Sequence, residues 1–309
     1  MARRYYRKLA VLAKPEASYG ADATPTGAAN AMLMTDVTVT PIVGERVSRD
    51  LLLPYFGDQG FVLAGTYARI EGSVEIAGTG AKGTVPDYGA LLRACGLAEI
   101  VTAGSMVEYK PVSAGQESVS IYANLDGVNH VMVGARGSLS VSLTPRQIPR
   151  FRFTLSGLLG EISDQPLPAA VFTAFKKALV VSKKNTTFQL HGIAPAMESF
   201  NFDLGNQVEP RMLVNAESIE IVDRKTSGTT VIEAVPLATK NWYATALNSI
   251  TGAMLATHGT VEGNIVEFQS GTVQVGEPTH GNSQGVLTTS LPLVLCPGSG
   301  DDEITIRVR

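Results

Sequence analysis

The chain has 309 residues, 44% of them hydrophobic, which is enough apolar material for two cores of ordinary domain size. Its 25 Lys and Arg against 28 Asp and Glu give a formal net charge of −3, which argues against a protein that grips nucleic acid through a basic surface. Only two cysteines, Cys95 and Cys296, are present, and this number excludes a disulfide framework or a four-cysteine metal site.

Glycine is abundant, with 31 residues, and long helical periodicities are scarce. Frequent Val, Thr and Ser add to the same signal, so the composition predicts an all-β fold with many turns and short helices. Residues 1–32 carry Pro15, Gly20, Pro25 and Gly27 among small residues, which predicts an irregular N-terminal arm.

The chain begins with basic residues, followed only by the short apolar run 9–13, which is too short for a signal peptide. No other segment approaches the length of a membrane span. We therefore expect a soluble protein that is made in a cytoplasm.

Residues 34–43 alternate between apolar and polar and predict a strand that enters a loop at Gly44. An apolar run follows inside this loop, and such a run either forms a contact surface or folds back on its own sandwich. The residues expected to contact another subunit or ring are Leu51, Leu52, Leu53, Tyr55 and Phe56.

The most regular strand of the first half spans residues 68–76. Because successive side chains of a strand point to opposite faces, one face is apolar and the other is polar. The apolar face carries Ile70, Gly72, Val74 and Ile76, and the polar face carries Arg69, Glu71, Ser73 and Glu75.

The remaining pattern divides the chain into two similar halves. A first β-sandwich is expected over 33–160, a linker over 161–186 and a second β-sandwich over 187–309. Each half contains a short predicted helix, at 86–96 and at 236–247.

An internal repeat supports this division. Residues 44–51 read Gly-Glu-Arg-Val-Ser-Arg-Asp-Leu, and residues 205–213 read Gly-Asn-Gln-Val-Glu-Pro-Arg-Met-Leu, just over half a chain later. Both follow an alternating run, and a long-period repeat of this kind indicates duplication of one module.

Two motifs resemble catalytic or cofactor-binding signatures, but neither has the required context. Residues 78–83 match G-x-G-x-x-G, with Glu99 downstream, yet the preceding strand alternates in charge, unlike a Rossmann strand buried on both faces. Residues 281–285 match the nucleophile-elbow pattern without a helix after them. The four histidines are dispersed, so the sequence predicts no catalytic, cofactor-binding or metal residue.

Several segments resemble the tail tube (major tail) proteins of long non-contractile-tailed bacteriophages. They are residues 14–31, the 44–51 stretch, the helix at 88–96 and the 197–211 segment. The resemblance implies a structural virion protein with two tandem tail-tube-type β-sandwich modules that contribute to a shared oligomeric β-barrel.

The resemblance also implies how the protein assembles. Chains with two fused modules form rings of three with pseudo-sixfold symmetry, with hexameric rings as the alternative, and stacked rings form a tube in the virion tail. The partners implied are further copies of the chain and the tape measure, tail terminator and distal tail proteins. Double-stranded DNA passes through without specific binding, and no membrane or cofactor takes part.

A channel for DNA should be uncharged or negative so that phosphates do not adhere. We therefore expect the polar face of the 69–75 strand, with Glu71, Ser73 and Glu75, to line it. The alternatives are another ring-forming tail component, such as a tail terminator or baseplate ring, and, third, a nucleotide-binding enzyme built on the 78–83 loop.

Overall fold

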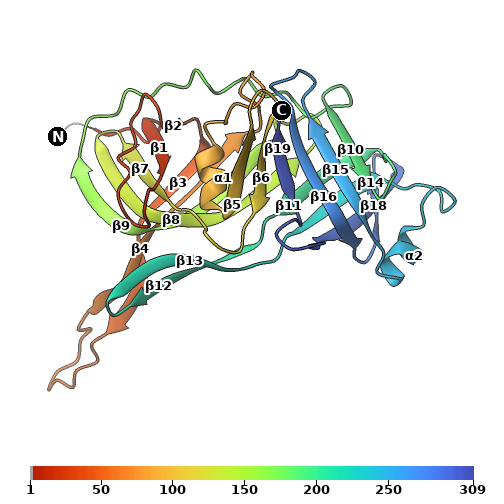
Figure 1. Ribbon diagram of the computed structural model, residues 1–309. Coiled ribbons are helices and arrows are strands. Elements are labelled where there is room, and N and C mark those ends of the chain that lie inside the picture. The colour runs from red at the N-terminus through yellow and green to blue at the C-terminus, as the bar shows by residue number, and fades with distance from the viewer. Residues whose placement is uncertain (1–2) are drawn as a thin grey trace.

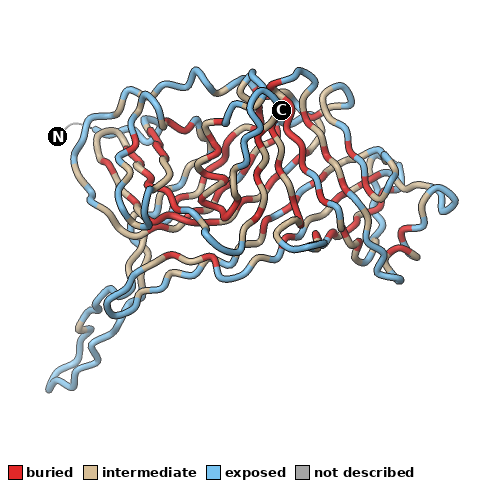
Figure 2. Tube along the Cα trace, viewed as in Figure 1, coloured by how far each residue is buried: buried red, intermediate tan, exposed pale blue. Residues whose placement is uncertain are grey.

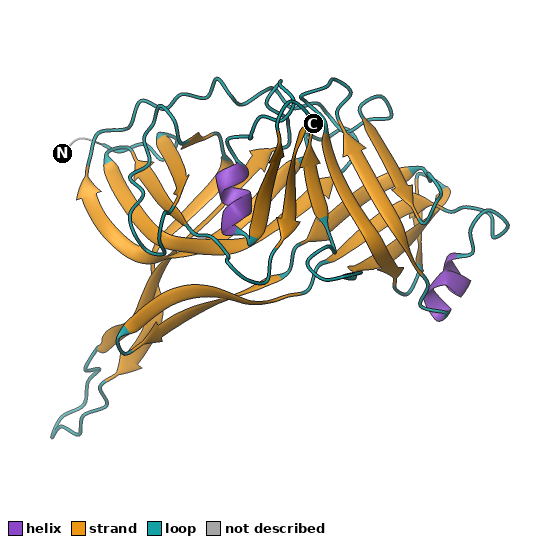
Figure 3. Ribbon diagram, in the orientation of Figure 1, coloured by secondary structure: helices purple, strands orange, loops and turns teal. Residues whose placement is uncertain are grey.

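The computed structural model describes residues 3–309 as a β protein with two short helices, α1 (Gly89–Ala94) and α2 (Trp242–Leu247) (Figures 1 and 3). The strands of the first half are β1 (Leu9–Pro15), β2 (Ala31–Met32), β3 (Thr35–Ser48), β4 (Phe61–Glu75), β5 (Leu97–Thr102), β6 (Met106–Pro111), β7 (Val119–Leu125), β8 (Val128–Leu143) and β9 (Arg150–Asp164). Those of the second half are β10 (Thr186–Leu190), β11 (Met197–Asp203), β12 (Asn206–Leu213), β13 (Ala216–Arg224), β14 (Ser227–Glu233), β15 (Thr251–His258), β16 (Val266–Val275), β17 (Thr279–Ser283), β18 (Val286–Leu295) and β19 (Thr305–Val308). The predicted all-β class and both predicted helices are confirmed.

One layer of the molecule is a sheet that runs through both halves. Its strands pair in the order β3-β4-β9-β8-β11-β14-β18-β17, every neighbouring pair antiparallel. The two halves join where β8 pairs with β11, with Ser142 opposite Asn201. We call this layer the inner sheet.

The second layer pairs in the order β5-β6-β19-β16-β15-β10 and also crosses between the halves, at the β6–β19 ladder. Ile304, Ile306 and Val308 of the C-terminal segment turn into the core, as their alternation predicts. The last strand thus ties the second half to the first.

A single apolar core fills the space between the two layers. Phe268 on β16 lies 6.0 Å from Phe151 and 5.5 Å from Phe202, measured between ring centroids, and these two belong to different halves of the inner sheet. Buried residues run in a continuous band between the layers (Figure 2). The halves therefore share one core.

The two halves nevertheless repeat one pairing order. The run β3-β4-β9-β8 of the first half recurs as β11-β14-β18-β17 in the second. In each half a short helix follows the second strand of the run, α1 after β4 and α2 after β14. The sequence motif that begins at Gly44 or Gly205 lies in a long hairpin in both halves: the β3–β4 hairpin, which is part of the first run, and the β12–β13 hairpin, which lies between β11 and β14 in the chain.

Some boundaries differ from those expected. Within the arm expected over 1–32, residues 1–2 lie outside the described residues, and 9–15 form β1 instead of irregular chain. Residues 10–13 are each at most 5% exposed and β1 pairs along its length with β7, because the apolar run of this segment gains a place in the core. Similarly, β9 continues to Asp164, inside the segment expected as linker.

Candidate assembly surfaces

The hairpin β3–β4 projects from the body of the molecule, and its tip is almost completely exposed (Figures 1 and 2). Strand β3 does not end at Gly44 but continues to Ser48, because β4 supplies a paired strand up to Phe61. The tip segment comprises residues 49–60. The side-chain amide of Gln59 accepts a hydrogen bond from the Leu51 N–H and donates one to the Leu51 carbonyl, and these two bonds close the loop.

The apolar residues predicted as contacts all lie on this tip. Leu52 and Phe56 are fully exposed, and the exposed fractions of the others range from 43% to 68%. The tip therefore does not fold back on its own sandwich, which was one of the two alternatives. The five residues are Leu51, Leu52, Leu53, Tyr55 and Phe56.

A second hairpin, β12–β13, forms a two-stranded sheet of its own and extends in the same direction (Figure 1). Its turn carries Leu213, 54% exposed, and Val214, 91% exposed. This exposed apolar turn was not predicted, although the repeated motif at 205–213 pointed to an equivalent of the first hairpin.

Arg136 on β8 fixes the second hairpin to the first half. Its guanidinium donates to the Ile219 carbonyl, at 3.0 Å, and to the Glu220 carboxylate, and it lies 4.7 Å over the ring of Tyr19. The Tyr19 hydroxyl accepts from the Ile219 N–H at 2.6 Å. Burial is the largest influence on the Tyr19 hydroxyl and raises its pKa, so the phenol stays protonated.

The inner sheet turns one face to the core and the other, polar face away from it. Short polar residues dominate this polar face on β8, β11 and β14, whereas β4 and β9 add charged residues. Its members include Ser138, Ser140, Ser142, Asn201, Asp203, Ser227 and Thr229, together with Arg69, Glu71, Ser73, Glu75, Arg150, Arg152 and Thr154. Side chains of this kind give a hydrated surface on these strands, whereas on β18 the same face carries Pro292 and Val294, opposite Thr229 and Ser227.

The three residues predicted to line a channel, Glu71, Ser73 and Glu75, lie on this polar face, but their side chains are exposed to different degrees. Glu71 and Glu75 are partly exposed, whereas Ser73 is only 5% exposed and offers little surface to any channel. The side chains of Arg69 and Arg152 approach the Glu71 carboxylate at 3.2 and 2.9 Å. Arg152 was not among the predicted residues, because cross-strand neighbours depend on a strand register that the sequence does not reveal.

Within the described residues, both outer strands of the inner sheet have a partner on one side only. β3 pairs with β4 and β17 pairs with β18. The Tyr6 hydroxyl also donates to the Val37 carbonyl of β3 at 3.0 Å. Unpaired backbone groups along such strands are available to another strand.

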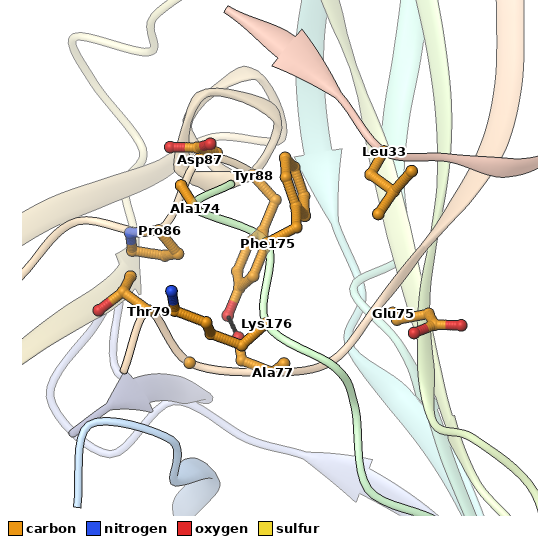
Figure 4. Close-up of a pocket in the computed structure, with 11 residues that line it drawn as sticks. Leu33, Glu75, Ala77, Thr79, Pro86, Asp87, Tyr88, Ala174, Phe175 and Lys176 are labelled. Atoms are coloured by element: carbon orange, nitrogen blue, oxygen red, sulfur yellow. Dashed lines mark hydrogen bonds between the residues drawn. The ribbon is translucent and has the colours of Figure 1, made fainter. Parts of the chain in front are cut away.

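The 78–83 glycine loop is a packing element. A Cβ on Gly78 would lie 2.2 Å from the Gly263 carbonyl oxygen, so only glycine allows the two loops to approach this closely. The cavity beside it measures about 30 Å³ and is lined by Tyr88, Phe175 and Lys176 among others (Figure 4). This volume matches about one water molecule and leaves no room for a nucleotide.

The other residues considered for chemistry are separated in the fold. Ser283 lies at the β17–β18 turn with no helix behind it. Burial lowers the pKa of both His191 and His258, which keeps the two rings neutral, and His258 bonds to Thr186 and to the Leu179 carbonyl. Among residues 3–309, no three His, Cys, Asp or Glu side chains are grouped as metal ligands would be.

A family model described as phage tail tube protein matches residues 7–306. The chain belongs to the phage tail tube protein family. Membership in this family identifies a structural component of the phage tail, in a class that is not one of enzymes. A comparison with curated protein sequences gives no significant match.

For a tail tube protein, the surfaces that matter are those that meet other subunits. The candidates within the described residues are the two projecting hairpins and the two open sheet edges. No helix in the described part of this tail tube chain is long and apolar enough to cross a membrane.

Proposed function

We propose that the protein polymerises as stacked rings of three subunits into the tail tube and forms the channel through which the genome passes. The observation that carries the proposal is the β8–β11 ladder between the two halves. It shows how the last strand of one four-strand run pairs with the first strand of the next run.

The repeated pairing order extends this contact to neighbouring subunits. β17 holds the place in the second run that β8 holds in the first, and β3 holds the place that β11 holds in the second. Both β17 and β3 lack an outer strand within residues 3–309. Pairing of β17 with β3 of the next subunit repeats the internal contact and leaves no edge open once the ring closes.

This arrangement is consistent with a ring of three subunits. Each chain contributes two equivalent modules, over 33–160 and 187–309, so three chains give six modules in pseudo-sixfold symmetry. The internal and the intersubunit ladders then alternate around one β-barrel. Sheet curvature from six modules encloses a wide channel instead of a packed core.

Stacking uses the projecting hairpins. The tip at 49–60 exposes Leu52 and Phe56 beyond the body of the subunit, where burial against another ring removes apolar surface from water. A head-to-tail contact of this kind repeats without limit along an axis and produces a tube. The tape measure, tail terminator and distal tail proteins are the partners that would set its length and close its ends.

The polar face of the inner sheet lines the channel in this assembly. Its hydroxyl and amide groups and the carboxylates of Glu71 and Glu75 leave phosphates without a fixed partner, so that DNA passes without specific binding. In the virion this surface faces the genome.

Paired cysteines test the ring contact directly. The internal ladder sets Asn201 opposite Ser142. Thr40 corresponds to Asn201 when the two motif copies are superimposed, and Ser283 corresponds to Ser142 through the β4–β9–β8 and β14–β18–β17 pairings. We expect the T40C/S283C variant, in a C296S background, to form covalent trimers when assembled tubes are oxidised.

The single variants T40C and S283C serve as controls, and each should remain monomeric in denaturing electrophoresis. The covalent species distinguishes the ring size, because closed trimers and closed hexamers differ in mobility. Assembled tubes that give no cross-link with this pair would exclude the proposed β17–β3 contact.

A further inference from the structure

The arginines on the polar face of the inner sheet are each matched by a carboxylate. Arg69 and Arg152 both approach Glu71, at 3.2 and 2.9 Å, and Arg150 approaches Asp36 at 3.4 Å. These side chains are between 30% and 62% exposed, so the pairs lie in contact with solvent. The three arginines come from β4 and β9, neighbouring strands of one sheet.

Glu71 occupies the central place in this group. It is two residues from Arg69 on the same face of β4, and it faces Thr154 on β9, next to Arg152, which is opposite Ser73. One carboxylate therefore stands between two guanidinium groups on adjacent strands. The local arrangement is three arginines against Asp36, Glu71 and Glu75, so the formal charges cancel.

Such cancellation matters wherever phosphates come near. A guanidinium binds a phosphate as readily as it binds a carboxylate, in both cases through two parallel hydrogen bonds. Each arginine or lysine that contacts a phosphate releases a counterion and adds to DNA affinity. In a ring these arginines recur in every subunit, so unpaired ones would retain DNA along the whole tube.

We propose that Glu71 masks Arg69 and Arg152 from phosphate and that this carboxylate keeps the polar face from holding DNA. The inference rests on the proposed function, because it takes this face as the one that the genome passes. It adds a defined role for one residue: Glu71 is an internal counter-ion that determines how the surface interacts with DNA.

The test compares binding of a short double-stranded DNA to the purified subunit by fluorescence anisotropy. We expect no measurable binding by the wild-type protein and salt-dependent binding by E71Q, since glutamine keeps the size of the side chain and removes its charge. Two freed arginines should give a slope of log affinity against log salt of about −2, because each phosphate contact contributes roughly −0.9.

A matched control separates masking from net charge. E262Q changes the net charge by the same amount as E71Q. It frees Lys82 of the 78–83 loop, whose ammonium lies 2.6 Å from the Glu262 carboxylate. This ion pair lies away from the polar face. E262Q should not bind DNA, and E71Q/R152Q should lose most of the gain. E71A, which frees the same two arginines, provides a second unmasking variant in case E71Q folds poorly.

Equal DNA binding by E71Q and E262Q, or no binding by either E71Q or E71A, would overturn the proposal. Phage that carry E71Q should assemble tails but eject their genome more slowly, and unchanged ejection despite DNA binding by the subunit would also overturn it. Failure of the wild-type protein to form tubes would count against the proposed function alone, since the binding comparison needs only the free subunit.

Discussion

At the scale of single residues, Arg136 shows how one buried charge can hold a projecting element in place. It is 9% exposed, and besides Ile219 and Glu220 it donates to the carbonyls of Gln116 and Glu117. The guanidinium thus links β8, the loop before β7 and the β12–β13 hairpin. Its five N–H groups in one plane suit this convergence of carbonyls, and a lysine could not reproduce it.

Removal of this side chain should loosen the second hairpin. We expect R136A to lower the free energy of unfolding by about 2–4 kcal/mol, since several buried carbonyls lose their donor. Urea denaturation measures the loss, and hydrogen exchange should rise within residues 216–224. R46A is the control, because Arg46 lies over Phe61 on the exposed hairpin and its loss should change stability by less than about 0.5 kcal/mol. Equal effects of the two substitutions would contradict the role of Arg136.

At the scale of elements, the two hairpins are strands whose outer parts have no core to cover. Strand β4 changes along its length: residues 61–65 are exposed on both faces, whereas residues 68–75 pack on the core with an alternating pattern that only the buried Ser73 interrupts. The inner part of β4 packs on the core of the subunit, and the exposed outer part can contact another subunit. Apolar residues that gain nothing in the folded subunit indicate a surface that another molecule covers.

Substitution of the tip should therefore separate folding from assembly. We expect L52S/F56S to leave the melting temperature of the free subunit within about 1 °C of the wild type, because both side chains are fully exposed. The variant should form no long tubes in electron micrographs. The substitution I100S, which alters a residue 45% exposed on β5 of the outer layer, provides a control that should still polymerise. Tubes of normal length from L52S/F56S would show that the tip is not the stacking contact.

At the scale of the whole molecule, the two halves repeat one strand-pairing order but form a single body. The pairing order repeats, yet both layers cross between the halves and Phe268 contacts aromatic rings from each. Because the two halves share a core and are joined by two β-ladders, we expect that neither half folds without the other. In the proposed ring, this shared core would hold the two halves of each chain at a fixed angle.

Unfolding should accordingly be a single event. We expect one calorimetric transition whose calorimetric and van't Hoff enthalpies agree, despite a length that suggests two domains. F268A should lower the stability of the whole chain by about 3–5 kcal/mol and shift this one transition without splitting it. Two resolved transitions, of which only one responds to F268A, would contradict the shared core.

Much of the local structure could be predicted from the sequence. The period-2 pattern at 68–76 and 304–308 predicted which side chains turn inward, because that pattern reflects burial on one face. The helix at 86–96 followed from its flanking proline and glycine. The apolar tip at 51–56 was also apparent, since its composition does not fit a solvated loop.

Other features could not be predicted in this way. The run at 9–13 lies in a segment expected to be irregular, yet it forms a buried strand because β7 lies beside it. The ion pair between Glu71 and Arg152 and the anchoring by Arg136 join residues far apart in the chain, and no local pattern identifies such partners. The open edges at β3 and β17 likewise follow only from the full order of pairing.

The sequence by itself determined the class of fold, the positions of several strands, the repeated motif and the resemblance to the tail tube family, because all of these depend on residue type and spacing along the chain. The tertiary structure alone decided that the two halves form one body, which strands stay unpaired and which charges neutralise one another. The physical reason is that a β-sheet is built from hydrogen bonds between distant segments, and their register is fixed only when the whole core packs.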